Sequence, residues 1–271
     1  MRAGDGPREA GKLIGRPREF TDVQTHEDRL LEPLSWRKPA RVFVNSMSDL
    51  FHEDVPDAFI GNVFSVMEQA PRHTFQILTK RAERMRAWVT EHAEWIDYAA
   101  GAGEFLRRYG HVWLGVSVEN QHFADERIPL LLQTSAAVRF ISAEPLLGPI
   151  DLSGPLNGFP EQVSAREYVT LDMAVDGGDR SLAGSLYSDD EWQQTMPPLD
   201  WVIVGGESGP GARPFDLAWA RSIVAQCKAA GVSVFYKQGG SSNRCRHDSK
   251  GGCFECVPDD LRVREFPHAH V

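Results

Sequence analysis

Several short apolar runs of the sequence end in residues that could do chemistry. Lys80 and Lys237 follow two such runs, and Glu144 follows another. A lysine at the end of a buried strand can bind a carboxylate or a phosphate, or can form a Schiff base where it is desolvated. A carboxylate in the same place can act as an acid or a base. Lys80, Glu144 and Lys237 are therefore the catalytic candidates, although each lysine could instead only form a salt bridge with Glu144 or Glu207.

Polar groups at the other run ends could bind a small polar ligand. Asp49 could be an acid, a base or a cofactor ligand, or it could only cap the next helix, and Ser48 has the same ambiguity. The GGESGPG segment at 205–211 resembles a phosphate loop only superficially, because Glu207 has the wrong charge and Pro210 has no N–H group. A close backbone approach to a ligand, with Glu207 binding an amine or a hydroxyl, fits these residues better. The ligand-binding candidates are Asn45, Ser48, Asp49, Thr79, Ser117, Glu119, Ser142, Gly205, Gly206, Glu207, Ser208 and Gln238.

All four cysteines lie late in the chain. Cys227 falls on the apolar stripe of a predicted helix, which is typical of a core residue. Cys245, Cys253 and Cys256, with His247 nearby, could bind zinc, because two residues separate Cys253 from Cys256 as in many zinc sites. The spacing of the other half is irregular, so cysteines that fall by chance in a C-terminal loop are the alternative.

The candidate residues need a scaffold that brings the run ends together. The runs are rich in β-branched and aromatic residues and are continuous rather than alternating, which is typical of strands buried on both faces. Helical patterns lie between most of them, so the sequence predicts a parallel sheet with crossover helices, either a (βα) barrel or a doubly wound sheet. In both folds ligands bind at the carboxyl ends of the strands. Strands are expected over 41–45, 74–79, 112–117, 138–142, 201–205 and 232–237, and helices over 56–70, 81–97, 120–134 and 216–230, with the third helix broken or restarted at Pro129.

Three parts are expected along the chain. Residues 1–20 have no apolar period and are interpreted as a flexible arm. Residues 21–240 form the barrel domain, with an insertion at 154–198, and residues 241–271 form a cysteine-containing tail.

Composition limits the classes of function. The chain has 271 residues, of which 42% are hydrophobic and 25% charged, as in ordinary globular proteins. A net charge of −9 argues against a general nucleic-acid binder, although a local basic cleft remains possible. No apolar stretch is long enough to span a membrane, and the first 30 residues contain no signal peptide, so the cytoplasm is the expected compartment.

Six long motifs stand out along the chain. They are RVFVNSMSDLFHEDVP (41–56), PRHTFQILTKRAERM (71–85), VWLGVSVEN (112–120), VRFISAEPLLGPIDL (138–152), DWVIVGGESGPGARP (200–214) and VFYKQGG (234–240). Together they resemble a phage and prophage family without an established reaction, whose full-length members carry a three-cysteine motif near the N-terminus. The resemblance implies a (βα) barrel similar to that of radical-SAM enzymes. In those enzymes three thiolates hold a [4Fe–4S] cluster, and the fourth iron binds S-adenosylmethionine.

The sequence departs from this family where the cluster should be. The family's cysteines precede the segment that corresponds to residues 20–40, whereas this chain has no cysteine before Cys227. We therefore expect an open or partial TIM-like barrel of about six strands that lacks the first strand and the cluster ligands. The expected function is that of a truncated or degenerate radical-SAM-like protein that binds a small polar ligand, such as S-adenosylmethionine, at the strand ends. The alternatives are a Schiff-base lyase that uses Lys80 or Lys237, and a non-enzymatic protein-binding partner with zinc in its tail.

Overall fold

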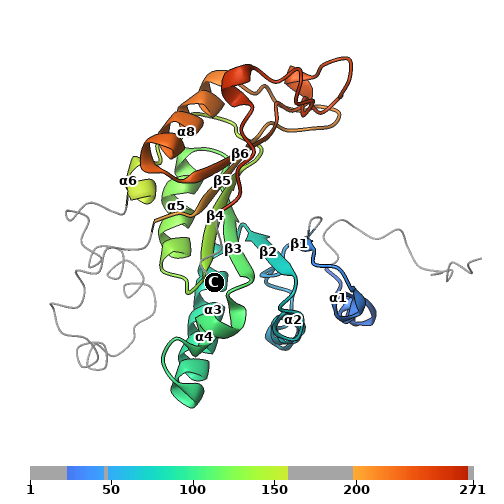
Figure 1. Ribbon diagram of the computed structural model, residues 1–271, viewed down its shortest axis with the longest axis vertical. Coiled ribbons are helices and arrows are strands. Elements are labelled where there is room, and N and C mark those ends of the chain that lie inside the picture. The colour runs from blue at the N-terminus through green and yellow to red at the C-terminus, as the bar shows by residue number, and fades with distance from the viewer. Residues whose placement is uncertain (1–22, 46–47, 158–197, 268–271) are drawn as a thin grey trace, which may run out of the picture.

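A curled sheet of six parallel strands forms the centre of the molecule (Figure 1). The computed structural model describes residues 23–45, 48–157 and 198–267. The strands pair in chain order from β1 to β6, so the sheet is an open half-barrel, and the predicted partial (βα) barrel is confirmed. The proposed arm at 1–20 and most of the insertion at 154–198 lie outside the described residues. The strands are β1 (Arg41–Val44), β2 (Thr74–Thr79), β3 (Val112–Ser117), β4 (Val138–Ala143), β5 (Trp201–Gly205) and β6 (Ser233–Gln238).

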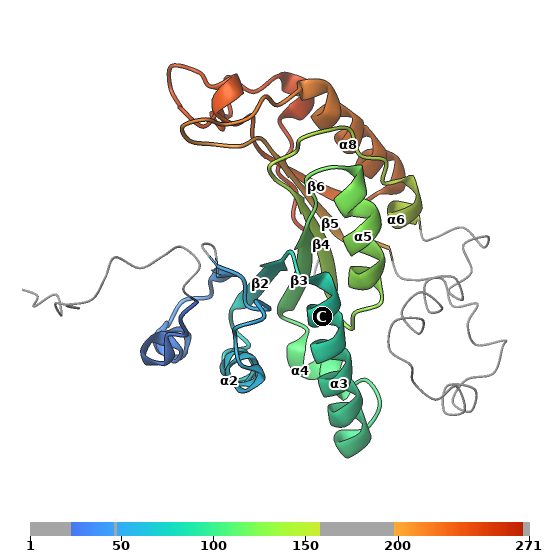
Figure 2. The ribbon, with the colours of Figure 1, turned by 180° about the vertical axis from the view of Figure 1, so that it is seen from behind.

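Helices follow most of the strands and pack on one face of the sheet (Figure 2). The predicted ends of α8 are confirmed, because the Asp216 side chain accepts a hydrogen bond from the Ala218 amide (2.8 Å) and Gly231 ends the helix at φ +69°. In the part of the chain described, no helix combines the length and apolar character needed to cross a membrane. The helices are α1 (Glu32–Ser35), α2 (Asp57–Glu68), α3 (Ala82–Ala100), α4 (Glu104–Tyr109), α5 (Gln121–Leu132), α6 (Ser153–Asn157) and α8 (Leu217–Ala230), with short 3-10 turns at Glu27–Arg29, Ser241–Asn243 and Asp259–Leu261.

The expected break at Pro129 is wrong, because α5 continues through this residue to Leu132. A proline inside a helix leaves the carbonyl four residues earlier without its usual donor. The loss of this hydrogen bond is offset at the start of α5, where the Asn120 side chain accepts a hydrogen bond from the Phe123 amide. It is also offset along the helix, because Ile128 and Leu131 are buried in the core.

Alternate residues of the strands fill two separate cores. Leu114 and Val116 of β3 belong to the large core between sheet and helices. Trp113, Phe140 and Trp201 belong to a smaller aromatic core. Because successive side chains of a strand point to opposite faces, this smaller core lies on the face away from the helices.

The tail returns to the last strand of the sheet. Phe235 of β6 forms an antiparallel bridge with Arg264, and the Glu265 amide donates to the Val234 carbonyl (3.0 Å). The tail therefore satisfies backbone groups along the open edge of β6. It also brings the segment that contains the three late cysteines to the end of the sheet where β5 and β6 finish (Figure 1).

Candidate functional site

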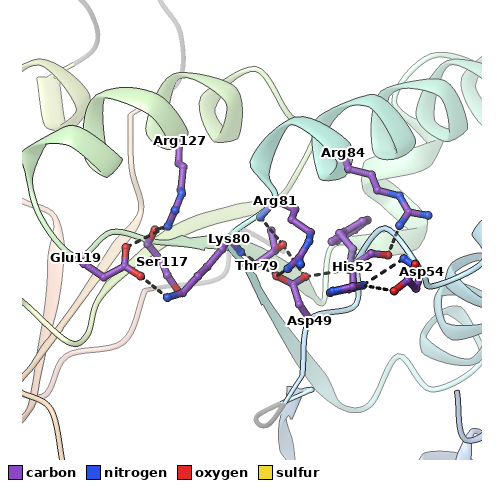
Figure 3. Close-up of polar contacts among 11 residues, drawn as sticks. Asp49, His52, Asp54, Thr79, Lys80, Arg81, Arg84, Ser117, Glu119 and Arg127 are labelled. Atoms are coloured by element: carbon purple, nitrogen blue, oxygen red, sulfur yellow. Dashed lines mark hydrogen bonds and ion pairs between the residues drawn. The ribbon is translucent and has the colours of Figure 1, made fainter. Parts of the chain in front are cut away.

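The rim is defined here as the strand ends and the loops that follow the carboxyl ends of β1 to β6. Asp49 of the first loop accepts hydrogen bonds from the Thr79 hydroxyl (2.7 Å) and the Lys80 amide (3.0 Å), and it forms an ion pair with Arg81 (3.2 Å), as Figure 3 shows. Its carboxylate also accepts from the Phe51 amide (3.0 Å), two residues further on. Asp49 therefore ties the loop after β1 to the end of β2, which is close to the capping alternative expected for it.

An ion triad, of which two members are buried, joins the ends of β2 and β3. The Glu119 carboxylate pairs with Lys80 on one side and with Arg127 of α5 on the other (3.1 Å to Nη1), as Figure 3 shows. Arg127 also donates to the Ser117 carbonyl (2.9 Å). Both Glu119 and Arg127 are buried, so each charge depends on the other for compensation. Lys80 therefore pairs with Glu119 and not with either of the two acids considered from the sequence.

A second polar group lies at the ends of β4, β5 and β6. The Glu144 carboxylate accepts from Lys237 Nζ (2.8 Å) and from Gln238 Nε2 (3.1 Å), so Lys237 forms one of the salt bridges considered for it. Gln238 also donates to the Gly206 carbonyl (3.2 Å). A Cβ atom at Gly205 would approach the Glu144 carboxyl carbon to 3.1 Å, so the glycine leaves room for this group.

The predicted amine-binding carboxylate is engaged within its own loop. Glu207 accepts from the Arg213 amide (2.9 Å) and from Arg213 Nε (2.7 Å) and Nη2 (3.0 Å). These hydrogen bonds lower the pKa of Glu207 to about 2.

The remaining ligand-binding candidates take no common position. Ser117 and Ser142 are buried in neighbouring strands, where they pair in register. Asn45 adopts a positive φ of 62° and accepts a backbone hydrogen bond from Ser48. Ser208 lies in the glycine-rich loop. Most of the charged candidates thus fall into two groups, one from the loop after β1 to the end of β3 and one at the ends of β4 to β6.

The late cysteines meet a histidine in a compact cluster. The ligand atoms of Cys245, His247, Cys253 and Cys256 all lie within 4.8 Å of one another. His247 Nδ1 lies 3.3 Å from Cys256 Sγ and 3.9 Å from Cys253 Sγ. Around a tetrahedral ion held at zinc distances, such atoms lie roughly 3.3 to 3.8 Å apart. The cluster could therefore hold a metal ion with little rearrangement.

Two tight turns build this cluster. In the first turn Asp248 accepts from the amides of Lys250 (2.8 Å) and Gly252 (2.8 Å) and bridges Cys245. In the second, the Cys256 amide donates to the Cys253 carbonyl (3.0 Å). Gly251 joins the turns at φ +71°, where a Cβ would approach the Asn243 carbonyl oxygen to 2.7 Å, so only glycine fits.

The thiols of the cluster shift each other's pKa values. Hydrogen bonds with Cys245 and Cys253 raise the pKa of the Cys256 thiol to about 11. Burial opposes ionisation of Cys245, but hydrogen bonds from the His247 amide and from Cys256 lower its pKa below the ordinary value. The protein's own groups therefore do not stabilise all the thiolates together, which is what a bound cation does.

The segment 241–257, called the metal module below, packs against the loop that follows β5. The Ser241 amide donates to the Glu207 carbonyl (2.8 Å), and Asn243 Nδ2 donates to the Phe215 carbonyl (2.9 Å). The Ser241 hydroxyl accepts from the Gly209 amide (3.0 Å). Figure 1 shows the module in red beside this orange loop.

Comparison with known families covers both the rim and the metal module. The model of a family described as a protein of unknown function (DUF5131) matches residues 8–257. The chain belongs to this family. No curated protein and no solved structure matches the chain. The family has no assigned activity, so the chemistry of the chain must be argued from its own residues.

The rim of this DUF5131 chain does not fit an iron–sulfur cluster of the kind that the resemblance implies. Such a cluster needs three thiolates at the site. Cys227 of α8 is buried in the large core, and this burial raises the pKa of its thiol to about 12. The other three cysteines lie in the metal module. The rim groups found above are carboxylates, amines, guanidinium groups and hydroxyls, which are hard ligands and hydrogen-bonding groups.

Three arginines at the rim were not among the residues predicted from the sequence. Arg81 and Arg127 bind the carboxylates of Asp49 and Glu119, and Arg213 binds Glu207. Arg81 directly follows Lys80, and Arg213 lies six residues after its partner, so proximity in sequence could have indicated both. Arg127 reaches the rim from a helix, and nothing in its local sequence indicates that.

Proposed function

We propose that this protein is a zinc-binding partial barrel in which Cys245, His247, Cys253 and Cys256 hold one zinc ion. The observation that supports this proposal is the approach of the four ligand atoms to within 4.8 Å. Three thiolates and an imidazole in a tetrahedral arrangement favour zinc over the oxygen-seeking cations. Four protein ligands leave no open coordination position, which is typical of a structural zinc rather than a catalytic one.

The surroundings of the ligands agree with a structural role. The described part of the metal module contains one short 3-10 turn and no longer element. Apolar burial within it is small, because Cys256, Phe254 and Glu255 are exposed. Segments of this kind are commonly held by a metal rather than by a core of their own. A bound zinc would supply a fixed crosslink between the two turns of the module.

Metal analysis of the purified full chain tests the proposal. We expect one zinc per chain after chelator-free purification and dialysis. Cys256→Ser should lose most of it, whereas Cys227→Ala, which removes a thiol from the core, should retain it. A wild-type chain without bound metal after zinc loading, or Cys256→Ser with unchanged zinc content, would contradict the proposal.

We propose as a second candidate function that the rim binds a small polar ligand, for which S-adenosylmethionine is one test compound. The observation that favours it is the exposure of the Lys80 and Lys237 side chains beside carboxylate side chains that are much less exposed. A ligand could reach each ammonium without separating it from its carboxylate. We favour ligand binding over Schiff-base chemistry because both amines are already engaged.

Two measurements separate these uses of the rim. Titration calorimetry with S-adenosylmethionine should show binding that Lys237→Gln weakens and that Arg221→Gln, an ion-pair cation on α8, leaves unchanged. Borohydride reduction in the presence of carbonyl compounds should leave no adduct on Lys80 or Lys237. A covalent adduct on either lysine would instead support the lyase alternative.

A further inference from the structure

A cavity of about 150 Å³ lies between the metal module and the part of the barrel formed by β6 and α8, which Figure 1 shows in orange and red. Leu217 of α8 and Tyr236 of β6 line it from the barrel, and Cys245 and Cys256 line it from the module. Among the described residues that line it, none has a carboxylate, an ammonium, a guanidinium or an imidazole group. A cavity of this volume can hold a six-membered ring such as benzene.

The hydroxyl of Tyr236 is a buried donor without an acceptor. The residue is 2% exposed, its side chain lines the cavity, and no described residue forms a hydrogen bond with its hydroxyl. The buried Tyr109, in contrast, donates from its hydroxyl to Glu68 (3.2 Å). Burial raises the pKa of Tyr236 to about 12, so the hydroxyl keeps its proton and can donate it. Because a buried hydroxyl costs stability unless it is hydrogen-bonded, this one indicates a partner from outside the chain.

Asn243 supplies the complementary group, an acceptor without a donor. Its Nδ2 atom donates to the carbonyl oxygens of Phe215 (2.9 Å) and Gly239 (3.2 Å), and these two bonds fix the orientation of the amide. The Oδ1 atom accepts no hydrogen bond from the described residues, and Asn243 also lines the cavity. The cavity therefore offers one free donor and one free acceptor, together with apolar side chains such as Leu217 and Val257.

We propose that this cavity binds a small uncharged ring compound that carries an amide group, with its C=O and N–H side by side. The Tyr236 hydroxyl donates to the carbonyl oxygen of this compound, Asn243 Oδ1 accepts from its N–H, and the ring packs against Leu217 and Val257. A charged ligand is disfavoured, because it would lose water without meeting an opposite charge. The inference rests on the proposed zinc site only in that Cys245 and Cys256 form part of the wall.

δ-Valerolactam and uracil serve as probes, because both are uncharged six-membered rings with adjacent C=O and N–H groups. Each is titrated into the zinc-loaded full chain, and the methyl NMR signals of Leu217 and Val257 report binding. At least one probe should shift both signals in a saturable way. N-methyl-δ-valerolactam, which lacks the N–H group, should bind about fivefold more weakly than δ-valerolactam, the usual size of one lost neutral hydrogen bond.

Two tyrosine variants separate binding from stability. Tyr236→Phe should weaken probe binding about fivefold without lowering the free energy of unfolding, because its hydroxyl has no partner to lose. Tyr109→Phe is the matched control: it removes the hydroxyl that donates to Glu68, so it should lower stability and leave probe affinity unchanged. Absence of binding by both probes, shifts confined to other parts of the chain, or the same loss of affinity in Tyr109→Phe would overturn the proposal.

The zinc proposal fails or stands separately. If the protein holds zinc but binds neither probe, the ligand cavity is wrong and the structural zinc remains. If the protein holds no zinc but binds a probe that Tyr236→Phe weakens, the metal site is wrong and the ligand cavity is supported. Circular dichroism of each variant confirms that its fold is retained.

Discussion

The rim and the metal module both gather polar side chains, but they differ in how those side chains are satisfied. At the rim, carboxylates such as Glu119 and Glu144 meet cations of the same chain. In the module, three sulfur atoms and one imidazole lie within 4.8 Å of one another. Four potential ligand atoms that converge on one point indicate an external cation, whereas carboxylates that pair with cations of the same chain can be structural on their own.

The largest effect should follow removal of the ion from the module. Structural zinc contributes on the order of 10 kcal/mol to folding of the segments it holds. Chelation should therefore greatly accelerate amide hydrogen exchange in residues 241–257, while exchange in β2 and β3 should stay slow. Cys253→Ser should reproduce the effect without chelator. Unchanged exchange in the module after complete metal removal would remove the contrast between the two regions.

At the rim, the largest loss of stability should follow from breaking the buried pair of Glu119 and Arg127. Glu119→Gln removes the closer and buried carboxylate partner of the Arg127 guanidinium and leaves only the more exposed Glu126, 3.9 Å away. Removing one member of a buried pair costs about 3 kcal/mol. Urea denaturation monitored by tryptophan fluorescence measures this free energy of unfolding. Asp260→Asn is the control, because it breaks an exposed pair with Arg221 and should cause no measurable change. Equal free energies of unfolding for the two variants would show that burial of the Glu119–Arg127 pair does not affect stability.

The strands and several element ends followed from the sequence because they depend on local patterns. The runs at 74–79 and 112–117 are the observed β2 and β3, since continuous β-branched and aromatic residues fit only strands covered on both sides. Asp216 and Gly231 bound α8 as expected, because caps use groups within a few residues. Pro129 misled the prediction because tertiary burial of α5 outweighs one lost backbone hydrogen bond.

The partners within the sites could be predicted less well. Position alone placed Lys80 and Glu119 at strand ends, but their pairing depends on the approach of β2 to β3, and Arg127 reaches them from a helix. The metal ligands were easier to predict from the sequence, because Cys253 and Cys256 are separated by one turn. His247 was noted only as a neighbour. Its place in the cluster depends on the turn at Asp248, whose carboxylate accepts hydrogen bonds from the amides of Lys250 and Gly252.

A pair of glycine substitutions compares the backbone demands of the two regions. Gly251→Ala places a Cβ at positive φ and 2.7 Å from the Asn243 carbonyl oxygen, so it should destabilise the module by about 1 to 3 kcal/mol and reduce zinc retention. Gly205→Ala needs only a few tenths of an ångström of movement from Glu144, so it should cost about 1 kcal/mol or less. Thermal unfolding and zinc titration measure both. A larger loss of stability in Gly205→Ala than in Gly251→Ala would mean that the backbone of the rim tolerates less change than that of the module.

The smallest effect concerns the exposed pair of Glu207 and Arg213. Hydrogen bonds from Arg213 lower the pKa of Glu207 from 4.5 to about 2. Because this pKa is depressed in the folded state, the pair contributes stability above pH 4.5 and loses it as the pH falls toward 2. The stability of Glu207→Gln should therefore fall less steeply than that of the wild type across this interval.

Acid also strips zinc from its ligands, but this loss is common to both proteins and cancels in their difference. Thermal unfolding of the two proteins in parallel at pH 5, 4, 3 and 2 isolates the contribution of the pair. Parallel curves would show that Arg213 does not hold the Glu207 carboxylate in solution. The Arg213 guanidinium would then be free to turn toward a ligand.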